Sequence, residues 1–222
     1  MTNLNDLLNQ FGGIENNSLN SIQKVDDLDD ASTNEEVMVM EQSPYYDDNT
    51  YIDKMKNNNH YSFTILSLNC ESLNSKIDNI RTKIDHLRNN KSEFGAICFQ
   101  ETRLNENADT LLLKINSFTL ITRGKICYGH GGLAIFLSNG YDYRILPLYK
   151  KSTIWEGHFI EITLSAMNKK IILGNIYRPP KNVNDNYKTF TEGLKPIIAH
   201  LGKQKSEVLI AGDFNIDLLK IK

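Results

Sequence analysis

The chain has 222 residues, of which 40% are hydrophobic and 23% are charged, and its formal net charge is −2. The length allows one domain plus a tail. The composition is typical of a globular protein, and it excludes a collagen, a wholly disordered chain and a disulfide-rich miniprotein. The small net charge hides an asymmetry, because residues 1–60 carry 12 acidic side chains against 3 lysines, whereas residues 61–222 carry 22 basic side chains against 15 acidic ones. An acidic head on a basic body suggests a domain that binds a polyanion.

Residues 1–60 are rich in Asn, Asp and Ser and show no sustained hydrophobic periodicity. Such a segment buries too little apolar surface to offset the entropy of ordering it. We therefore predict a mostly disordered acidic tail over residues 1–60, with a short helix at residues 4–11. The tail is either a plain solvated segment or an interaction arm.

The pattern changes at residue 61. Residues 63–68 alternate like a strand, and the continuous apolar run at residues 95–99 indicates a strand buried on both faces. Between them lies a predicted helix, which Asn74 or Ser75 can cap. Its apolar face is formed by residues at helical spacing, namely Leu73, Ile77, Ile80, Ile84 and Leu87.

Strands and one more helix follow, most of them separated by Gly, Asn, Lys or Pro. The predicted strands are residues 118–123, 132–137, 141–147, 154–164, 169–176 and 208–211. In the longest of them, Ile160, Ile162 and Leu164 share one face. The second helix covers residues 185–201, with Pro196 as a kink and an inward face of Tyr187, Phe190, Leu194, Ile197 and Leu201. No internal repeat and no Gly-rich phosphate loop is present in the sequence.

The three cysteines, Cys70, Cys98 and Cys127, are widely spaced and form no CxxC pair, which is typical of reduced thiols in an intracellular protein. The N-terminus lacks the pattern of a secretory signal, and no run approaches the roughly 18 apolar residues of a membrane-spanning helix. We expect an intracellular protein with no membrane partner, nuclear if it is functional. The sequence does not indicate its oligomeric state.

Polar residues follow several of the predicted strands. They are Asn69, Gln100 and Glu101, Asn175, Tyr177 and Arg178, and Asp213 and Asn215. If the carboxyl ends of these strands lie on one side of the molecule, their side chains converge on one rim, where rigid strands hold them in place.

The residue types favour metal-assisted attack on a phosphodiester. Glu101 offers a hard oxygen ligand for Mg²⁺, which takes one or two protein carboxylates together with water and phosphate oxygens. Asp213 is suited to orienting the attacking water. Asn69, Asn215 and Tyr177 are neutral donors for phosphoryl oxygens whose negative charge grows in the transition state.

Each motif also has a structural interpretation. Residues 212–215 are compatible with an ordinary turn, and residues 177–180 with a loop that leaves a strand. Glu101 and Arg103 are able to form a surface ion pair, and Asn69 is able to cap the turn that follows it. These readings explain poorly why all four motifs lie at corresponding strand ends.

The ordered motifs resemble the endonuclease/exonuclease/phosphatase superfamily. The resemblance covers residues 61–222, and it is nearest to the apurinic-type endonuclease domain of non-LTR (LINE-type) retrotransposons. It implies an α/β fold, a four-layered α/β sandwich of two packed mixed sheets flanked by helices. The motifs are residues 68–69, 100–102 (QET), 131–135 (GGLAI), 175–180 (NIYRPP) and 212–215 (GDFN).

The resemblance also implies roles for single residues. Glu101 matches the metal ligand, and Asn69 the amide that helps to order the metal site. Tyr177 matches the tyrosine that contacts the scissile phosphate, Asp213 the aspartate that positions the nucleophilic water, and Asn215 the amide that steadies the phosphorane. The implied cofactor is Mg²⁺, with Mn²⁺ as a substitute, and the implied partner is DNA.

The family pattern continues with a Ser-Asp-His stretch that has no counterpart here, because His130, His158 and His200 all precede Asp213. We therefore expect a domain that is incomplete at its C-terminus and an impaired Mg²⁺-dependent DNA endonuclease. The alternative is a non-catalytic relic that binds nucleic acid or protein. Phosphoinositide phosphatases and sphingomyelinases share the Glu, Asp and Asn positions, so fold analogy leaves the substrate open.

Overall fold

The computed structural model describes residues 50–53, 63–105, 109–123, 131–148, 154–180 and 187–216. The chain divides into two compact units, Met1–Lys54 and Met55–Lys222. The described part of the first unit is one helical turn at residues 50–53. The acidic segment and its predicted helix at residues 4–11 lie outside the described residues, and all elements below belong to the second unit.

The first sheet is mixed and has the strand order β1-β2-β4-β3. Its strands are β1 (Ile65–Asn69), β2 (Ala96–Gln100), β3 (Phe118–Arg123) and β4 (Leu133–Ser138). Strand β4 is antiparallel to β2 and β3, whereas β1 and β2 are parallel and are joined by helix α3 (Leu73–Asn89). A parallel pair needs a crossover connection, which α3 supplies.

The second sheet repeats this plan with the order β5-β6-β7-β8. Its strands are β5 (Asp142–Leu146), β6 (Glu156–Leu164), β7 (Lys169–Tyr177) and β8 (Glu207–Asp213). The parallel pair β7 and β8 is joined by helix α4 (Tyr187–Leu201), and the other pairs are antiparallel. Two short 3₁₀ helices, η1 (Thr110–Leu113) and η2 (Ser165–Met167), complete the described elements.

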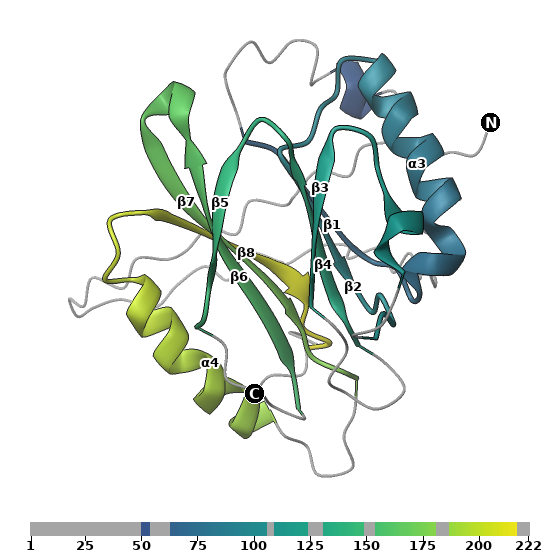
Figure 1. The fold of residues 1–222 in the computed structure, drawn as a ribbon. Coiled ribbons are helices and arrows are strands. Elements are labelled where there is room, and N and C mark those ends of the chain that lie inside the picture. Colours follow the sequence, from purple (N-terminus) through teal and green to yellow (C-terminus); the bar gives the residue numbers. More distant parts are fainter. Residues whose placement is uncertain are drawn as a thin grey trace, which may run out of the picture. The chain divides into compact units, whose positions relative to one another are not determined.

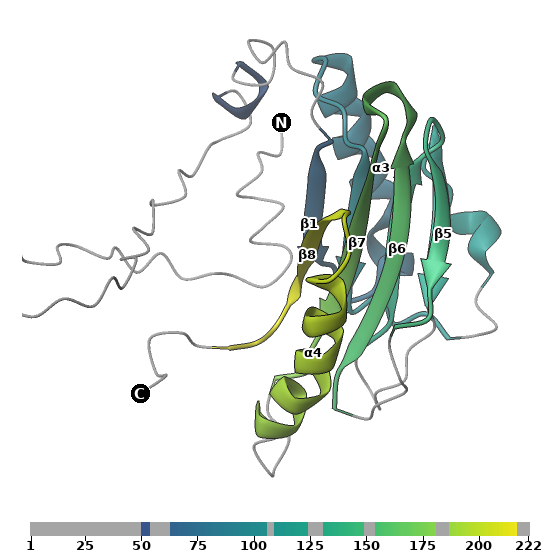
Figure 2. The ribbon, with the colours of Figure 1, turned by 90° about the vertical axis from the view of Figure 1, so that its left-hand side faces the viewer.

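The elements form the four-layered α/β sandwich that the resemblance implies. Figure 1 shows the layers in the order α4, second sheet, first sheet, α3, and Figure 2 shows α4 lying along the second sheet. The core between the sheets includes Cys98 and Ile135 from the first sheet and the predicted face of Ile160, Ile162 and Leu164 from the second. A second cluster packs α4 on the opposite face of the second sheet through Phe190 and other side chains.

The observed helices and strands lie within a few residues of the predicted ones, because their apolar periodicities are strong. Pro196 lies inside α4, whose buried residues include Phe190, Ile197 and Leu201. The predicted N-cap of α3 is wrong. Ser72 occupies that position without a side-chain cap, and the first helical N–H, that of Leu73, donates to the carbonyl of Thr102 instead. A tertiary contact thus replaces a local one.

Both described cysteines are buried free thiols, and Cys127 lies outside the described residues. Burial raises the pKa of Cys70 to about 11 and that of Cys98 to about 12, so both remain protonated at neutral pH. In the part of the chain that the structure describes, no helix has the length and apolar character needed to cross a membrane.

The buried His158 should make the fold sensitive to acid. Burial, and then the positive charge of Arg123, lowers the pKa of His158 from 6.5 to about 4. Because the unfolded chain takes up this proton first, stability is lost as the pH falls from 6.5 to about 4, by about 3 kcal/mol. Urea unfolding of wild type and His158→Gln at several pH values measures this difference. The exposed His200→Gln variant is the control, and equal pH profiles for all three chains would contradict the prediction.

Candidate functional site

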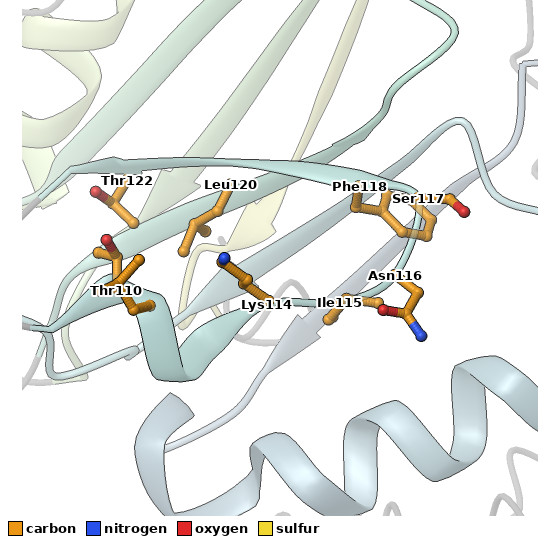
Figure 3. A pocket seen from close by; sticks show the side chains of 9 residues that line it. Thr110, Lys114, Ile115, Asn116, Ser117, Phe118, Leu120 and Thr122 are labelled. Atoms are coloured by element: carbon orange, nitrogen blue, oxygen red, sulfur yellow. The ribbon is translucent and has the colours of Figure 1, made fainter.

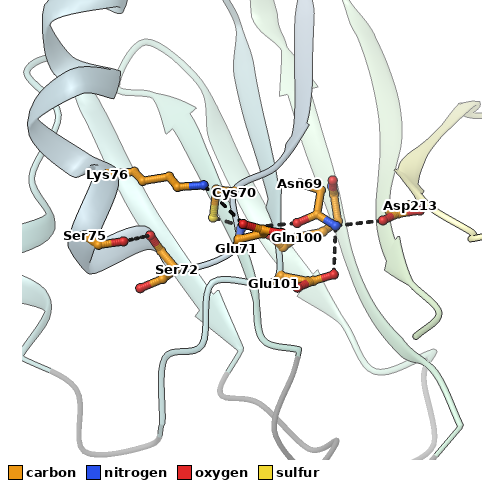
Figure 4. A network of polar contacts seen from close by, with 9 residues as sticks. All are labelled: Asn69, Cys70, Glu71, Ser72, Ser75, Lys76, Gln100, Glu101 and Asp213. Carbon is orange, nitrogen blue, oxygen red and sulfur yellow. Dashed lines mark hydrogen bonds and ion pairs between the residues drawn. The ribbon is translucent and has the colours of Figure 1, made fainter. Parts of the chain in front are cut away.

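The carboxyl ends of β1, β2, β7 and β8 meet at one end of the two sheets. The polar side chains at these strand ends lie close enough to hydrogen-bond, although the sequence separates Asn69 from Asp213 by 144 positions. Figure 4 shows Asn69 lying between Glu101 and Asp213. The structure thus brings Asn69, Glu101, Tyr177 and Asp213 together, with Asn215 two residues further along the loop.

Asn69 bridges the two carboxylates of the site. Its Nδ2 atom donates to Oε1 of Glu101 at 2.9 Å and to Oδ2 of Asp213 at 2.8 Å. Its Oδ1 atom accepts from the backbone N–H of Glu71 at 3.2 Å, which determines which end of the amide is the nitrogen. Asn69 therefore does hold the following turn, as the structural interpretation proposes, but it also holds both carboxylates.

Glu101 lies in a tightly held loop after β2. Its side chain is buried, and the hydroxyl of the fully buried Tyr177 donates to its Oε1 atom at 2.9 Å. The backbone of Glu101 is left-handed, with φ of 51°, a conformation that costs free energy for a residue with a side chain. Backbone hydrogen bonds from Thr102 to Gly132 (3.1 Å) and from Arg103 to Gly131 (2.8 Å) hold the loop.

Asp213 and Asn215 lie in a compact turn at the end of β8. Asp213 Oδ1 accepts from the Asn215 N–H at 3.0 Å, and Asn215 has a left-handed backbone with φ of 47°. The side-chain amide of Asn215 donates to the carbonyl of Arg178 at 2.8 Å. A side chain at Gly212 would collide with the carbonyl oxygen of Ile176, so glycine is required at this close approach.

A buried amide pair lies beneath these residues and joins the two sheets. Gln100 Nε2 donates to Asn175 Oδ1 at 2.6 Å. Asn175 Nδ2 in turn donates to the carbonyls of Phe99 and Ala134, both at 3.1 Å. The sequence placed both amides at strand ends but assigned no role to them. Gln100 directly precedes Glu101, and Asn175 lies two residues before Tyr177. The amide pair therefore sets the distance between Glu101 and Tyr177.

Sequence reasoning missed Glu156, the first residue of β6. Its side chain is 1% exposed, and its Oε2 atom accepts from the Gly132 N–H at 2.7 Å. Because Gly131 and Gly132 hold the backbone of Thr102 and Arg103, Glu156 supports the loop of Glu101 from the opposite sheet. Its only sequence signal is one charge at the start of an apolar strand, which is common at protein surfaces.

Of His130, His158 and His200, the structure describes the last two. His158 is in β6, with its Nδ1 atom buried and without a hydrogen-bond partner among the described residues. His200 is in the last turn of α4, where its ring contacts the Gln204 side chain. His130 lies outside the described residues.

The donor set is compatible with a hard divalent cation. Over the described ranges, no three His, Cys, Asp or Glu side chains gather in one place. The site instead offers two carboxylates, Glu101 and Asp213, at hydrogen-bond distance from the same nitrogen atom. Mg²⁺ fits such a set, because it takes one or two carboxylates and keeps water or phosphate oxygens as its other ligands.

A groove of about 440 Å³ lies elsewhere, over the outer face of β3 and beside η1. Figure 3 shows its lining, which includes Leu120 and Thr122 of β3 and Lys114. None of the predicted site residues lines it. The convergence of polar strand ends, rather than the volume of this groove, therefore locates the candidate site.

Comparison with known proteins supports the fold through structure rather than sequence. No family model and no curated protein matches the sequence. The human Nocturnin catalytic domain with bound sulfate has a TM-score of 0.51 at 11% identity, over 70% of this chain and 64% of that one. TDP2 of D. rerio complexed with a single-strand DNA product has 0.51 at 15% identity, over 71% and 62%.

AP endonuclease LMAP from Leishmania major has a TM-score of 0.50 at 16% identity, over 69% of this chain and 55% of that one. This chain thus spans less than two thirds of each of these three structures. The neighbours belong to the endonuclease/exonuclease/phosphatase superfamily. Their likeness shows that this chain has the fold of that superfamily.

The buried amide pair should be a large contributor to stability. Asn175→Ala leaves the carbonyls of Phe99 and Ala134 and the amide of Gln100 without this buried partner, so we expect a loss on the order of 3 kcal/mol. Urea unfolding measures the loss. Ser67→Ala, which removes a weaker bond to Gln100 (3.2 Å) from an exposed position, is the control and should cost less than about 1 kcal/mol. Equal losses in the two variants would contradict the prediction.

Proposed function

We propose that this site hydrolyses DNA phosphodiesters with Mg²⁺, or with Mn²⁺ in its place. The observation that supports the proposal most is the shared nitrogen of Asn69, which holds the carboxylates of Glu101 and Asp213 side by side, with the Tyr177 hydroxyl on Glu101. Two adjacent carboxylates flanked by neutral donors suit a reaction in which negative charge grows on phosphoryl oxygens.

The proposed roles divide between the two carboxylates. Glu101 binds the metal, which when bound supplies positive charge to the phosphoryl oxygens. Asp213 orients the attacking water through the carboxylate that Asn69 and the Asn215 N–H hold from two sides. Asn69 thereby acts on the metal ligand and on the water-orienting residue at once.

Tyr177 and Asn215 are the proposed donors to the substrate. The Tyr177 hydroxyl is buried and donates to Glu101 Oε1 at 2.9 Å, so it must exchange this bond to donate to a phosphoryl oxygen. Asn215 donates to the Arg178 carbonyl, so its side chain must turn to steady a phosphoryl oxygen. Both groups are neutral and therefore add no charge of their own to the metal site.

The finer assignment, a retrotransposon-type DNA endonuclease acting in the nucleus, rests on the YRPP and GGLAIF motifs in residues 61–222. Two further observations support nucleic acid as the partner. The segment carries 22 basic against 15 acidic side chains, and the TDP2 neighbour is complexed with a single-strand DNA product. Basic side chains bind phosphates of the DNA backbone and release counterions.

Nicking of supercoiled plasmid tests the proposed function. We expect the chain to nick plasmid in the presence of Mg²⁺ or Mn²⁺. Glu101→Gln and Asp213→Asn should each remove this activity, because each variant loses one of the two carboxylates that Asn69 holds. The exposed Asp78→Asn variant on α3 is the charge-matched control and should nick like wild type.

Nicking that persists in Glu101→Gln would contradict the proposal. Salt-dependent DNA binding without any nicking by wild type would favour the binding-module alternative, since counterion release needs no catalysis.

Metal binding is testable without turnover. Saturating Mg²⁺ or Mn²⁺ should raise the thermal midpoint of wild type by a few degrees, because a ligand that binds only the folded state stabilises it. Glu101→Gln should lose this shift and Asp78→Asn should keep it. Differential scanning fluorimetry with and without EDTA measures the shift, and an identical shift in all three chains would place the metal elsewhere.

A further inference from the structure

Arg178, the residue directly after β7, hydrogen-bonds to the end of β8 and to the first two residues after it. Its Nε atom donates to the carbonyl of Phe214 at 2.7 Å, and its Nη2 atom donates to the carbonyl of Asn215. Its backbone N–H donates to the carbonyl of Asp213 at 2.9 Å. One residue thus bonds to three consecutive residues, among them the proposed catalytic Asp213 and Asn215.

The contact is reciprocal and partly enclosed. The side-chain amide of Asn215 donates back to the Arg178 carbonyl at 2.8 Å. The guanidinium carbon lies 5.9 Å from the ring centroid of Phe190 on α4, and Phe190 in turn packs against Phe214 at 6.2 Å. The guanidinium is therefore confined between the helix and the loop.

The geometry of the contact suits arginine and not lysine. Two nitrogens on the planar guanidinium reach two successive carbonyls at once, which the single ammonium group of lysine does not reproduce. The charge of Arg178 is also directed at backbone oxygens of the chain itself. These oxygens belong to Phe214 and Asn215, so the guanidinium holds the conformation of the loop.

We propose that Arg178 is a positioning residue for the phosphodiester site, an inference that rests on the proposed function. The fork, meaning the pair of guanidinium hydrogen bonds to the carbonyls of Phe214 and Asn215, holds the loop in one conformation. In that conformation Asp213 Oδ1 accepts from the Asn215 N–H at 3.0 Å and Oδ2 accepts from Asn69 at 2.8 Å. Without the fork, the carbonyls of Phe214 and Asn215 lose their guanidinium partners, and of Arg178 only the backbone groups still contact this left-handed segment. The carboxylate of Asp213 is then no longer held in one orientation.

This role has a kinetic signature. A residue that touches neither substrate nor metal leaves substrate binding unchanged, but a displaced Asp213 lowers the rate of the chemical step. We therefore expect Arg178→Ala and Arg178→Lys in the full chain to lower kcat for plasmid nicking by about 10²-fold, with KM within about threefold of wild type.

The control is Arg144→Ala, which removes the same charge from β5, where the Arg144 side chain is 67% exposed and paired with Glu161. This variant should keep the wild-type kcat. Added guanidinium at millimolar concentration should restore nicking by Arg178→Ala, because the vacated space beside Phe190 accepts the planar cation, whereas ammonium should not. Arg178→Lys should not respond, because its own side chain fills that space.

Several outcomes overturn the inference. A wild-type kcat in Arg178→Lys would show that charge alone suffices, and a loss confined to KM would make Arg178 a substrate contact. If added guanidinium failed to restore nicking by Arg178→Ala, the paired hydrogen bonds of the guanidinium would not explain the role of Arg178. If Arg178→Ala does not fold, the kcat of Arg178→Lys decides. Wild type that neither nicks plasmid nor binds Mn²⁺ overturns the proposed function and this inference with it, whereas active variants beside active wild type overturn the inference alone.

Discussion

The buried amides of Gln100 and Asn175 hold the two sheets in one relative position. Every hydrogen bond of the Asn175 side chain crosses from the second sheet to the first, reaching Gln100 and the carbonyls of Phe99 and Ala134. Both side chains are at most 1% exposed, so water cannot replace a lost partner. A shift of one sheet against the other would leave several buried polar groups unsatisfied, and the network therefore selects one registry.

The loops that carry the candidate site depend on that registry. Glu101 follows Gln100 directly and Tyr177 lies two residues after Asn175, so the amide pair determines where the hydroxyl of Tyr177 meets the carboxylate of Glu101. The strained backbone of Glu101 is supported from both sheets, through Gly131 and Gly132 and through Glu156. Left-handed residues persist where the surrounding structure over-determines them, and here the surroundings are two rigid sheets.

The fold follows well from sequence periodicity, and the supporting residues of the site do not. Ile160, Ile162 and Leu164 occupy the core because alternation is a local property of a strand. The cap of α3 was mispredicted because the N–H of Leu73 bonds to Thr102, a residue far away in the chain. Glu156 gave no distinctive signal, since a single charged residue at a strand end has many ordinary explanations, and Arg178 lay in the YRPP motif without an assigned role.

The sequence by itself determined the α/β class, the order of strands and helices, and the presence of Asn69, Glu101, Tyr177 and Asp213 at strand ends. Only the tertiary structure decided that Glu101 and Asp213 bind the same nitrogen of Asn69, and that Arg178 holds the loop after β8. The physical reason is the separation along the sequence of the residues that interact. Apolar periodicity is encoded within a few neighbouring residues, whereas contacts between residues that are distant in sequence depend on how the whole core packs the two sheets together.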